Sequence, residues 1–401
     1  MRTFEKTHPW IKFELDLRRF DHELWMALGE AESKCEHIAG VPLQPATAEK
    51  LHLMYLAKGV RATTAIEGNT LTEEEVIERI EGKHPLPPSR EYLGIEVDNI
   101  LAGCNDIKKK MMRGEAEGLS VAEITEFNKT VLNGLELEKD VVPGAIRKYS
   151  VGVGGYRGAP AEDCEYLLEK LCTWLNAPEF NPHEHAISFS VIRAIVAHLY
   201  IAWIHPFGDG NGRTARLLEF KILLSSGIPT PAAHLLSNHY NLTRTEYYRQ
   251  LDVASKSKGD IVPLIRYAVE GFVDGLRSQL KVVQQQQLLV AWRDYVYGHF
   301  RDKTGKINER LRKLVLDLSS QKDPLPMTKL DQVSPRVAAL YATKTQKTIR
   351  RDVAALLKAD LIKQVDGGFI ANKEVMLSFL PERNRKTIAV AKKGGAKPHV
   401  R

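Results

Sequence analysis

Cysteine is scarce in this sequence, and none of it is paired. The 401 residues contain four cysteines, scattered without a Cys-x-x-Cys pair or a neighbouring histidine. Disulfide frameworks and structural zinc sites depend on such local clusters, so neither is indicated. We expect ordinary thiols in a reducing compartment, and hence a cytoplasmic protein. The four are Cys35, Cys104, Cys164 and Cys172.

The sequence also lacks the signatures of export and membrane insertion. Its first residues, MRTFEKTHPWIKF, carry charges throughout and contain no apolar signal-peptide core. An apolar stretch from residue 187 to 207 is interrupted by Arg193 and His198. A membrane span takes about 20 predominantly apolar residues with few or no charges. We therefore expect a buried core helix here, and no membrane partner.

The net charge is low except at the C-terminus. The formal net charge is +7, and residues 381–401 hold seven Lys or Arg against Glu382, so this basic tail accounts for +6 of it. Such a tail either attracts nucleic acid or an acidic surface, or is simply solvated. The chain is 43% hydrophobic and 27% charged, as in soluble globular proteins, and its length accommodates two or three domains.

One segment, residues 205–216 with the sequence HPFGDGNGRTAR, gathers groups for phosphate chemistry. His205 accepts a proton near neutral pH, because an unperturbed imidazole has a pKa of about 6.5. Asp209 offers a hard oxygen ligand suited to Mg²⁺. The segment therefore predicts a general base beside a metal-binding carboxylate.

The same segment predicts an anion site. Gly210, Asn211 and Gly212 allow the backbone to approach an anion closely, and the free N–H groups of a helix that begins here would add to the site. Arg213 and Arg216 are three residues apart, so on such a helix they share a face that suits a polyphosphate.

Segment 205–216 resembles the signature of the Fic (Fic/Doc) proteins, HPFx(D/E)GNGRxxR, with every specified position occupied. Further similarity lies at Ala194 and His198, in PGAIRKYSVGVGG (143–155) and in YYRQLDVASKSKGDIVPLI (247–265), so that it spans roughly residues 60–275. The resemblance implies a protein adenylyltransferase, an enzyme that moves AMP from ATP onto a protein hydroxyl.

The resemblance also implies a role for each residue. His205 would be the catalytic base and Asp209 the Mg²⁺ ligand. ATP would be held through the amides of Gly210 to Gly212, the side chain of Asn211, and Arg213 at the β-phosphate. A rival pattern, the dinucleotide fingerprint formed by Gly210, Gly212 and Ala215, is disfavoured because residues 230–240 contain no acid for a ribose.

Residues 147–158 predict a short hairpin, because they are rich in glycine, β-branched and aromatic residues and lack helical periodicity. The hairpin resembles the Fic flap, which holds a target segment by strand addition beside the active site. An ordinary connecting hairpin is the alternative. The residues expected to bind the target are Arg147, Lys148, Tyr149, Ser150, Val151 and Gly152.

The sequence TTAIEGN places Thr63 and Glu67 four residues apart on one predicted helix face, with Gly68 as its stop. It resembles the inhibitory motif (S/T)xxxE(G/N) of Fic proteins. Glu67 would then pair with Arg216 and compete with the γ-phosphate for the same guanidinium. A solvated glutamate before a capping glycine is the alternative.

Helical periodicity elsewhere predicts a mainly α fold, a Fic helical core with a β-hairpin flap, followed by a C-terminal winged helix-turn-helix. Helix-like spacing covers residues 10–60, and Gln284 to Gln287 either end a long helix or begin a linker. The predicted organisation is an N-terminal helical region at 1–90 with the inhibitory helix at about 60–68, a catalytic core at 91–287, a winged-helix-like domain at 288–380 and the basic tail at 381–401.

The predicted winged helix has helical patterns at 328–341 and 344–359, then a hairpin signal around Asp366-Gly367. Residues 328–365 carry eight basic and three acidic side chains. A protein-binding or dimerisation role is as open as DNA binding. The candidates for contact with DNA phosphates are Lys344, Lys347, Arg350 and Arg351.

Two classes of function remain open at this point. The first is an enzyme, an adenylyltransferase with ATP and Mg²⁺, or a Fic variant that removes AMP or transfers phosphate. The second is a DNA-binding regulator in which the nucleotide site is a sensor. The Fic resemblance is also compatible with a homodimer, and the target protein is not named by the sequence.

Overall fold

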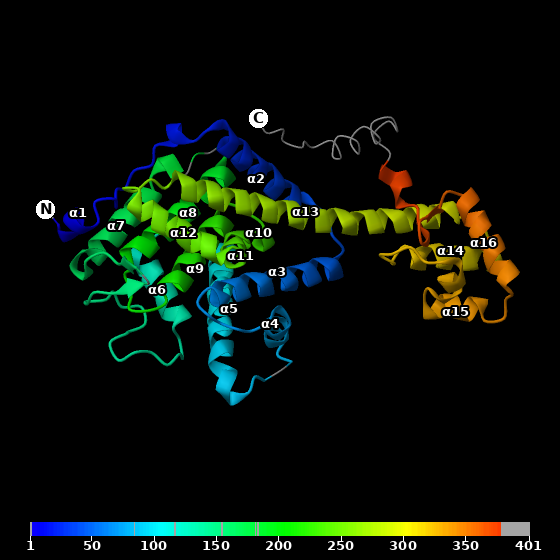
Figure 1. Ribbon diagram of the computed structural model, residues 1–401, viewed down its shortest axis with the longest axis horizontal. Helices are drawn as coiled ribbons and strands as arrows, with labels where there is room; N and C mark the ends of the chain where they lie inside the picture. Colours follow the sequence, from blue (N-terminus) through cyan, green and yellow to red (C-terminus); the bar gives the residue numbers. More distant parts are fainter. Residues whose placement is uncertain are drawn as a thin grey trace, which may run out of the picture. The chain divides into compact units, whose positions relative to one another are not determined.

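The computed structural model describes residues 2–377 apart from positions 84, 116, 117, 154, 181 and 183 (Figure 1). The predicted basic tail at 381–401 lies outside these residues. The chain divides into two compact units, of which the first is Met1–Val283 and the second begins at Gln284. The first unit contains both the region 1–90 and almost all of the predicted core. The predicted mainly α fold is confirmed.

The first unit is built around two packed helices, α8 (Ala186–Ile204) and α9 (Asn211–Ser225). Most side chains of α8 are buried, which explains the apolar composition of this stretch. Within the described residues, α8 is also the one helix long and apolar enough to cross a membrane. Its burial fits the predicted core helix, since packing inside the protein accounts for its hydropathy.

Several helices surround this pair. α3 packs on α5 and α11, and α5 and α6 pack on α9, so regions far apart in sequence share one core. The bounds of these helices are α3 Pro45–Ala65, α4 Glu73–Ile80, α5 Glu91–Met112, α6 Val121–Val131, α7 Cys164–Leu175, α10 Thr230–Ala233, α11 Leu235–Leu242 and α12 Arg244–Lys256.

The N-terminal segment departs from the prediction. After α1 (Thr3–Thr7) the chain is irregular, with a 3₁₀ turn at Leu17–Arg19, and α2 (His22–Gly40) begins only after Asp21. The helix expected from residue 10 was therefore wrong up to this point. The carboxylate of Asp21 accepts the Leu24 N–H at 3.0 Å and so caps α2. Ile11 and Phe20 are buried from the irregular backbone before it.

The long helix α13 (Val262–His299) continues past the predicted end at residue 287. The run Gln284 to Gln287 lies inside this helix, because glutamine is a good helix former and the run contains no glycine or proline. The division between the two units falls at the start of the run.

The predicted flap hairpin is present, but its paired part is short. β1 (Gly152–Val153) and β2 (Tyr156–Arg157) are antiparallel, with Gly152 opposite Arg157. The Gly158 N–H donates to the Val151 carbonyl at 3.1 Å and extends the ladder by one pair.

The second unit contains helices followed by a hairpin. The hairpin turns at Asp366-Gly367 as predicted, and Leu325 bridges to Phe369 beside it. Residues 328–341 do not form one helix, because Pro335 begins a new one capped by Ser334. The elements are α14 Lys306–Leu318, a 3₁₀ helix Met327–Gln332, α15 Pro335–Tyr341, α16 Gln346–Lys358, β3 Ile362–Val365 and β4 Gly368–Ala371.

Candidate active site

The loop between α8 and α9 is a tight turn with two left-handed residues. His205 has φ 50° and its N–H donates to the Ile201 carbonyl at 2.9 Å, while Gly210 has φ 75° and begins α9. Inside the turn, the Asn211 side chain donates to the Phe207 carbonyl at 2.9 Å and accepts the Phe207 N–H at 3.0 Å. The buried Asn211 side chain therefore fixes the loop, and its role in holding phosphate stays a prediction.

His205 is set up as a base through its second ring nitrogen. Its Nδ1 lies 3.4 Å from the Ala202 carbonyl, an acceptor that favours a proton on Nδ1. The lone pair is then on Nε2. Burial lowers the pKa of His205 below its ordinary value, and the hydrogen bond to Ala202 opposes this only in part. The ring is therefore neutral and able to accept a proton at neutral pH.

Arg147 is a buried anchor of this loop and does not face a target. Its guanidinium donates to the carbonyls of His205 at 2.6 Å, Tyr149 at 2.5 Å and Ala159 at 2.5 Å. Its main-chain N–H donates to the Pro206 carbonyl at 2.9 Å. Burial lowers the pKa of Arg147. The prediction of target contact is thus wrong for Arg147, whose contacts join the flap to the catalytic loop.

The other predicted flap residues lie on the surface or partly on it. Tyr149 reaches over the loop, since a Cβ placed on Gly208 would collide with its hydroxyl. The main chain is open along β1, as no described residue outside the hairpin bonds to Gly152. Along β2 the Arg157 carbonyl is already bonded to His8 Nε2 at 2.8 Å. Gly152 is therefore open to an added strand, and contact of Lys148, Tyr149, Ser150, Val151 and Gly152 with a target stays a prediction.

Glu67 lies against the first turn of α9, where the sequence predicts an anion site. Asn211, Gly212 and Arg213 are in the first turn, where N–H groups have no helical acceptor. A Cβ on Gly212 would collide with Glu67 Oε1 and would lie 3.1 Å from Arg216 Nη1. The carboxylate thus lies directly on the turn where a phosphate would bind, and the missing side chain of Gly212 makes room for it.

Glu67 also pairs with Arg216, as the sequence predicted. The Arg216 side chain is fully buried, and its Nη2 donates to Glu67 and, at 2.9 Å, to the Thr63 carbonyl. Burial opposes ionisation of Glu67, but the charge and hydrogen bond of Arg216 together with the charges of Arg213 and Arg244 outweigh it, so the pKa of Glu67 lies below its ordinary value. The pair is therefore ionised at neutral pH.

The geometry of this motif differs from the prediction. α3 ends at Ala65, so Glu67 lies in the turn after the helix, which Gly68 completes with φ 105°. The Thr63 hydroxyl donates to the Gly59 carbonyl at 2.9 Å, so Thr63 acts on Arg216 through its main chain. Helix α12 holds the turn in place, with Tyr248 bonded to the Ile66 carbonyl at 3.4 Å.

Arg213 is held by two carboxylates, one of which sequence reasoning missed. It lies 2.9 Å from Glu96 Oε1 and 3.2 Å from Asp209 Oδ2. Glu96 also accepts from Asn69 at 2.8 Å. A phosphate is a suitable replacement for either carboxylate, because guanidinium binds both in the same forked geometry. No local pattern connects Glu96 on α5 with the loop that it supports.

Asp209 is placed to hold a metal together with a phosphate. Half of its side chain is exposed, and its Oδ1 accepts the Gly210 N–H at 2.5 Å. No three His, Cys, Asp or Glu residues of the described chain converge as a metal cluster. Mg²⁺ commonly uses one or two carboxylates together with substrate phosphates and water, so a single exposed carboxylate beside an anion site fits it.

Two buried polar groups lie behind the site, of which sequence reasoning missed Asn128. Asn128 on α6 donates to the Asp209 carbonyl at 2.9 Å and accepts the Gly144 N–H at 2.9 Å. His198 on α8 lies between Tyr247, at 2.7 Å, and Glu219, at 3.0 Å. Both contacts tie the catalytic helices to neighbouring elements.

Comparison with known proteins agrees with this geometry. Residues 118–223 match the model of the Fic/DOC family, and this range contains the loop and both arginines. The segment that holds the site is therefore similar to the Fic/DOC family. Its Fic region is 32% identical over 209 residues to the protein adenylyltransferase fic-1 of Caenorhabditis elegans, which is 52% of this chain and 38% of the nematode protein. The protein adenylyltransferase Fic of Nematostella vectensis is 26% identical over 315 residues, or 77% of this chain and 63% of that relative.

Solved Fic structures share the fold. A Fic family protein from Desulfovibrio desulfuricans G20 aligns with a TM-score of 0.54 at 20% identity, covering 90% of this chain and 95% of that one. Fic-1 of C. elegans, residues 134–508, aligns with a TM-score of 0.53 at 25% identity, covering 65% and 73%. These alignments place the Fic loop on a helical scaffold shared with these proteins.

In the second unit, the four predicted DNA-contact residues lie at or near the start of α16. Lys344, Lys347 and Arg350 are exposed and have no carboxylate partner among the described residues. Arg351 is exposed as well and lies 4.0 Å from Asp352. The core of the unit contains an ion pair between Arg310 and Asp352 at 2.7 Å, which Tyr341 joins at 2.9 Å.

Proposed function

We propose that this protein is a protein adenylyltransferase that moves AMP from ATP to a Ser, Thr or Tyr hydroxyl of a target protein. The observation that carries the proposal is the convergence of a neutral base, His205, with a helix N-terminus and two buried arginines on one turn. Relatives that are named protein adenylyltransferases match this same region.

In the proposed reaction, His205 Nε2 takes the proton of the target hydroxyl as its oxygen attacks the α-phosphorus of ATP. The bond from that phosphorus to the bridging oxygen of pyrophosphate breaks, and pyrophosphate leaves. A positioned base of this kind is worth roughly 10² to 10⁴ in rate. The open edge of β1 fixes the target segment, so the hydroxyl stays within reach of the base.

We propose that the groups now paired with carboxylates bind the phosphates of ATP instead. The N–H groups of Gly212 and Arg213 would bind the α-phosphate region at the start of α9. Arg213 would exchange Glu96 and Asp209 for the β-phosphate, and Arg216 would exchange Glu67 for the γ-phosphate. Mg²⁺, bound by Asp209, would neutralise phosphate charge as pyrophosphate develops.

We propose that Glu67 inhibits this reaction. Its carboxylate lies on the anion site and pairs with Arg216, so ATP binds in a productive way only when the turn after α3 moves. Removal of AMP from a target, with Glu67 activating water, and transfer of phosphate are the competing chemistries for the same residues.

The test is labelling by ATP that carries radioactive α-phosphate, compared with ATP labelled at the γ-phosphate. We expect α-label in protein for Glu67→Gly, and a loss of about 10² or more when His205→Ala is added. Glu74→Gln, at an exposed glutamate of α4, is the matched control and should not change labelling. Incorporation of γ-label alone would replace adenylylation with phosphate transfer.

A second candidate activity belongs to the second unit, where we propose that the start of α16 contacts DNA phosphates. Its support is the exposure of Lys344, Lys347 and Arg350 together with a following hairpin. Salt-sensitive binding to duplex DNA that is lost when these three become alanine would support it. If DNA binding does not depend on salt, or if no DNA is bound, a protein-binding role remains for the second unit. The homodimer and the cytoplasmic location stay predictions.

A further inference from the structure

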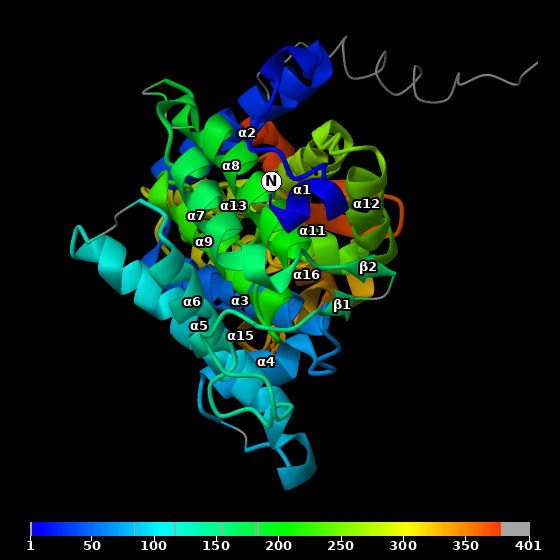
Figure 2. The same cartoon turned by 90° about the vertical axis from the view of Figure 1, so that its left-hand side faces the viewer.

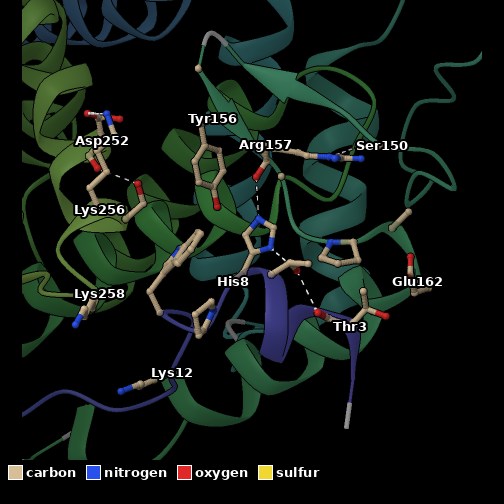
Figure 3. Close-up of a pocket in the computed structure, with 18 of the residues that line it drawn as sticks. Thr3, His8, Lys12, Ser150, Tyr156, Arg157, Glu162, Asp252, Lys256 and Lys258 are labelled. Carbon is tan, nitrogen blue, oxygen red and sulfur yellow. Dashed lines mark hydrogen bonds and ion pairs between the residues drawn. The ribbon is translucent and has the colours of Figure 1, made fainter.

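A cavity of about 1090 Å³ lies beside the flap, outside the nucleotide site (Figure 3). Its walls come from the N-terminal segment Thr3–Lys12, the flap residues Lys148–Pro160 and the end of α12 at Asp252–Lys258. Figure 2 shows α1, the flap strands and α12 on the same side of the first unit. The volume is at the upper end for small-molecule pockets, which suits a longer ligand such as a polypeptide segment.

The N-terminal wall is held in place by specific contacts. The Phe4 N–H donates to Asp163 at 2.7 Å, and His8 Nε2 is bonded to the Arg157 carbonyl at 2.8 Å. Phe4 and Ile11 are buried in the core of the unit. The cavity is therefore formed before any ligand arrives, so binding does not have to order this wall.

Two residues of the cavity wall, Tyr149 and Gly158, lie against the catalytic loop. Gly158 lines the cavity, and a Cβ on Gly158 would lie only 2.8 Å from the Cβ of His205. Tyr149, also in the lining, reaches over Gly208 of the loop. Lys148, Tyr149 and Ser150, which precede β1, line the cavity, so a chain that follows this segment would have its neighbouring residues beside the cavity.

The rim of the cavity is positively charged. Five exposed cations surround it against two carboxylates, Glu162 and Asp252, and Asp252 is already paired with Lys256 at 2.7 Å. Among the described residues, no carboxylate pairs with three of the lysines. The floor between them is aromatic, with Trp10 and Tyr156. The five cations are Lys12, Lys148, Arg157, Lys256 and Lys258, and the three unpaired lysines are Lys12, Lys148 and Lys258.

We propose that this cavity binds an acidic segment of the target polypeptide that flanks the modified hydroxyl. The proposal rests on the adenylyltransferase function above and adds a substrate preference to it. Unpaired lysines around an aromatic floor complement Glu and Asp side chains on a chain whose backbone follows β1. The charge of these lysines affects binding of the target and not the chemical step, since none of the three is part of the base or of the phosphate site.

The test measures binding without catalysis, using the full chain in the absence of nucleotide. The probes are two fluorescent peptides that contain one serine, of which one has a glutamate-rich flank and the other has glutamine at the same positions. We expect tighter binding of the acidic peptide, and a loss of about tenfold in Lys12→Ala/Lys148→Ala/Lys258→Ala, because exposed ion pairs are individually weak. The control, Lys50→Ala/Lys109→Ala/Lys281→Ala, removes equal charge from exposed sites outside the cavity and should leave affinity unchanged.

Equal losses in the two triple variants would overturn the proposal, because they would reflect net charge alone. Equal affinity for the two peptides would also overturn it, as would tighter binding of a single-stranded oligonucleotide at the same cations. Failure of the proposed function gives a different result. In that case the acidic peptide binds as expected but gains no α-label from ATP with the Glu67→Gly chain.

Discussion

Glu67 lies so close to Gly212 that any side chain at residue 212 would collide with its carboxylate. The absence of a side chain at Gly212 thus leaves room for the Glu67 carboxylate in the described state and for the phosphate expected in the nucleotide-bound state. This shared space makes the two ligands mutually exclusive, and it does so through sterics in addition to competition for Arg216.

The first prediction follows from that collision. Gly212→Ala should lower the free energy of unfolding by about 1–3 kcal/mol, the usual cost of overpacking. In a Glu67→Gly background the same change should be nearly neutral, because the colliding group is gone and alanine is a better helix former than glycine. Urea unfolding of the four chains of this double-mutant cycle measures the coupling. Additive effects would show that Glu67 does not occupy the turn in solution.

The second prediction concerns the cost of releasing Arg216. Glu67→Gln should raise AMP transfer but lower stability by about 1–3 kcal/mol, since it leaves a buried guanidinium without its counter-charge. The cost is below that of a fully buried pair because 34% of the Glu67 side chain is exposed. ATP with Mg²⁺ should restore the loss, by about 2.7 kcal/mol at a hundredfold excess over Kd. Thermal unfolding with and without nucleotide checks both parts, and an equal gain in Arg216→Gln would argue against binding through this arginine.

The third prediction is the pH dependence of transfer. Because burial lowers the pKa of His205, the base should stay deprotonated down to the ordinary histidine value of 6.5. The value of kcat/KM should therefore be level from alkaline to neutral pH and fall only below 6.5, as the ring takes up a proton. The profile is best measured in Glu67→Gly, which removes one neighbouring carboxylate whose charge raises the pKa of His205. A midpoint above 6.5 would contradict the assigned environment of the ring.

Some of these features could be predicted from sequence and others could not, for a physical reason. His205, Asp209 and the arginines lie within one segment, so local spacing was enough to place them together. Glu96 reaches the site only through the packing of α5 on α9, and no local pattern announces it. Local spacing in the sequence indicates which residues can contact one another within a turn. Contacts between helices form only in the folded core.

Burial was the other quantity that the sequence did not show. Arg147 was predicted as a target contact because its segment resembles the Fic flap, whereas its guanidinium is enclosed by carbonyl groups. Helical spacing between residues 10 and 20 was likewise misleading, since Ile11 and Phe20 are buried from an irregular chain. The amphipathic pattern records which residues are buried, and an irregular segment fixed on a core satisfies it as well as a helix does.

The last prediction separates the two units. Arg310 and Asp352 form a buried pair that joins α14 to α16, so Asp352→Ala should destabilise the second unit by about 3–5 kcal/mol. Hydrogen exchange should then accelerate in residues 306–371 and stay unchanged in residues 118–223, and AMP transfer should persist. Replacing both partners, as in Arg310→Met/Asp352→Leu, should recover most of the protection, because an apolar pair carries no desolvation cost. Loss of protection in both units would instead show that the second unit supports the fold of the catalytic unit, and transfer would then fall together with it.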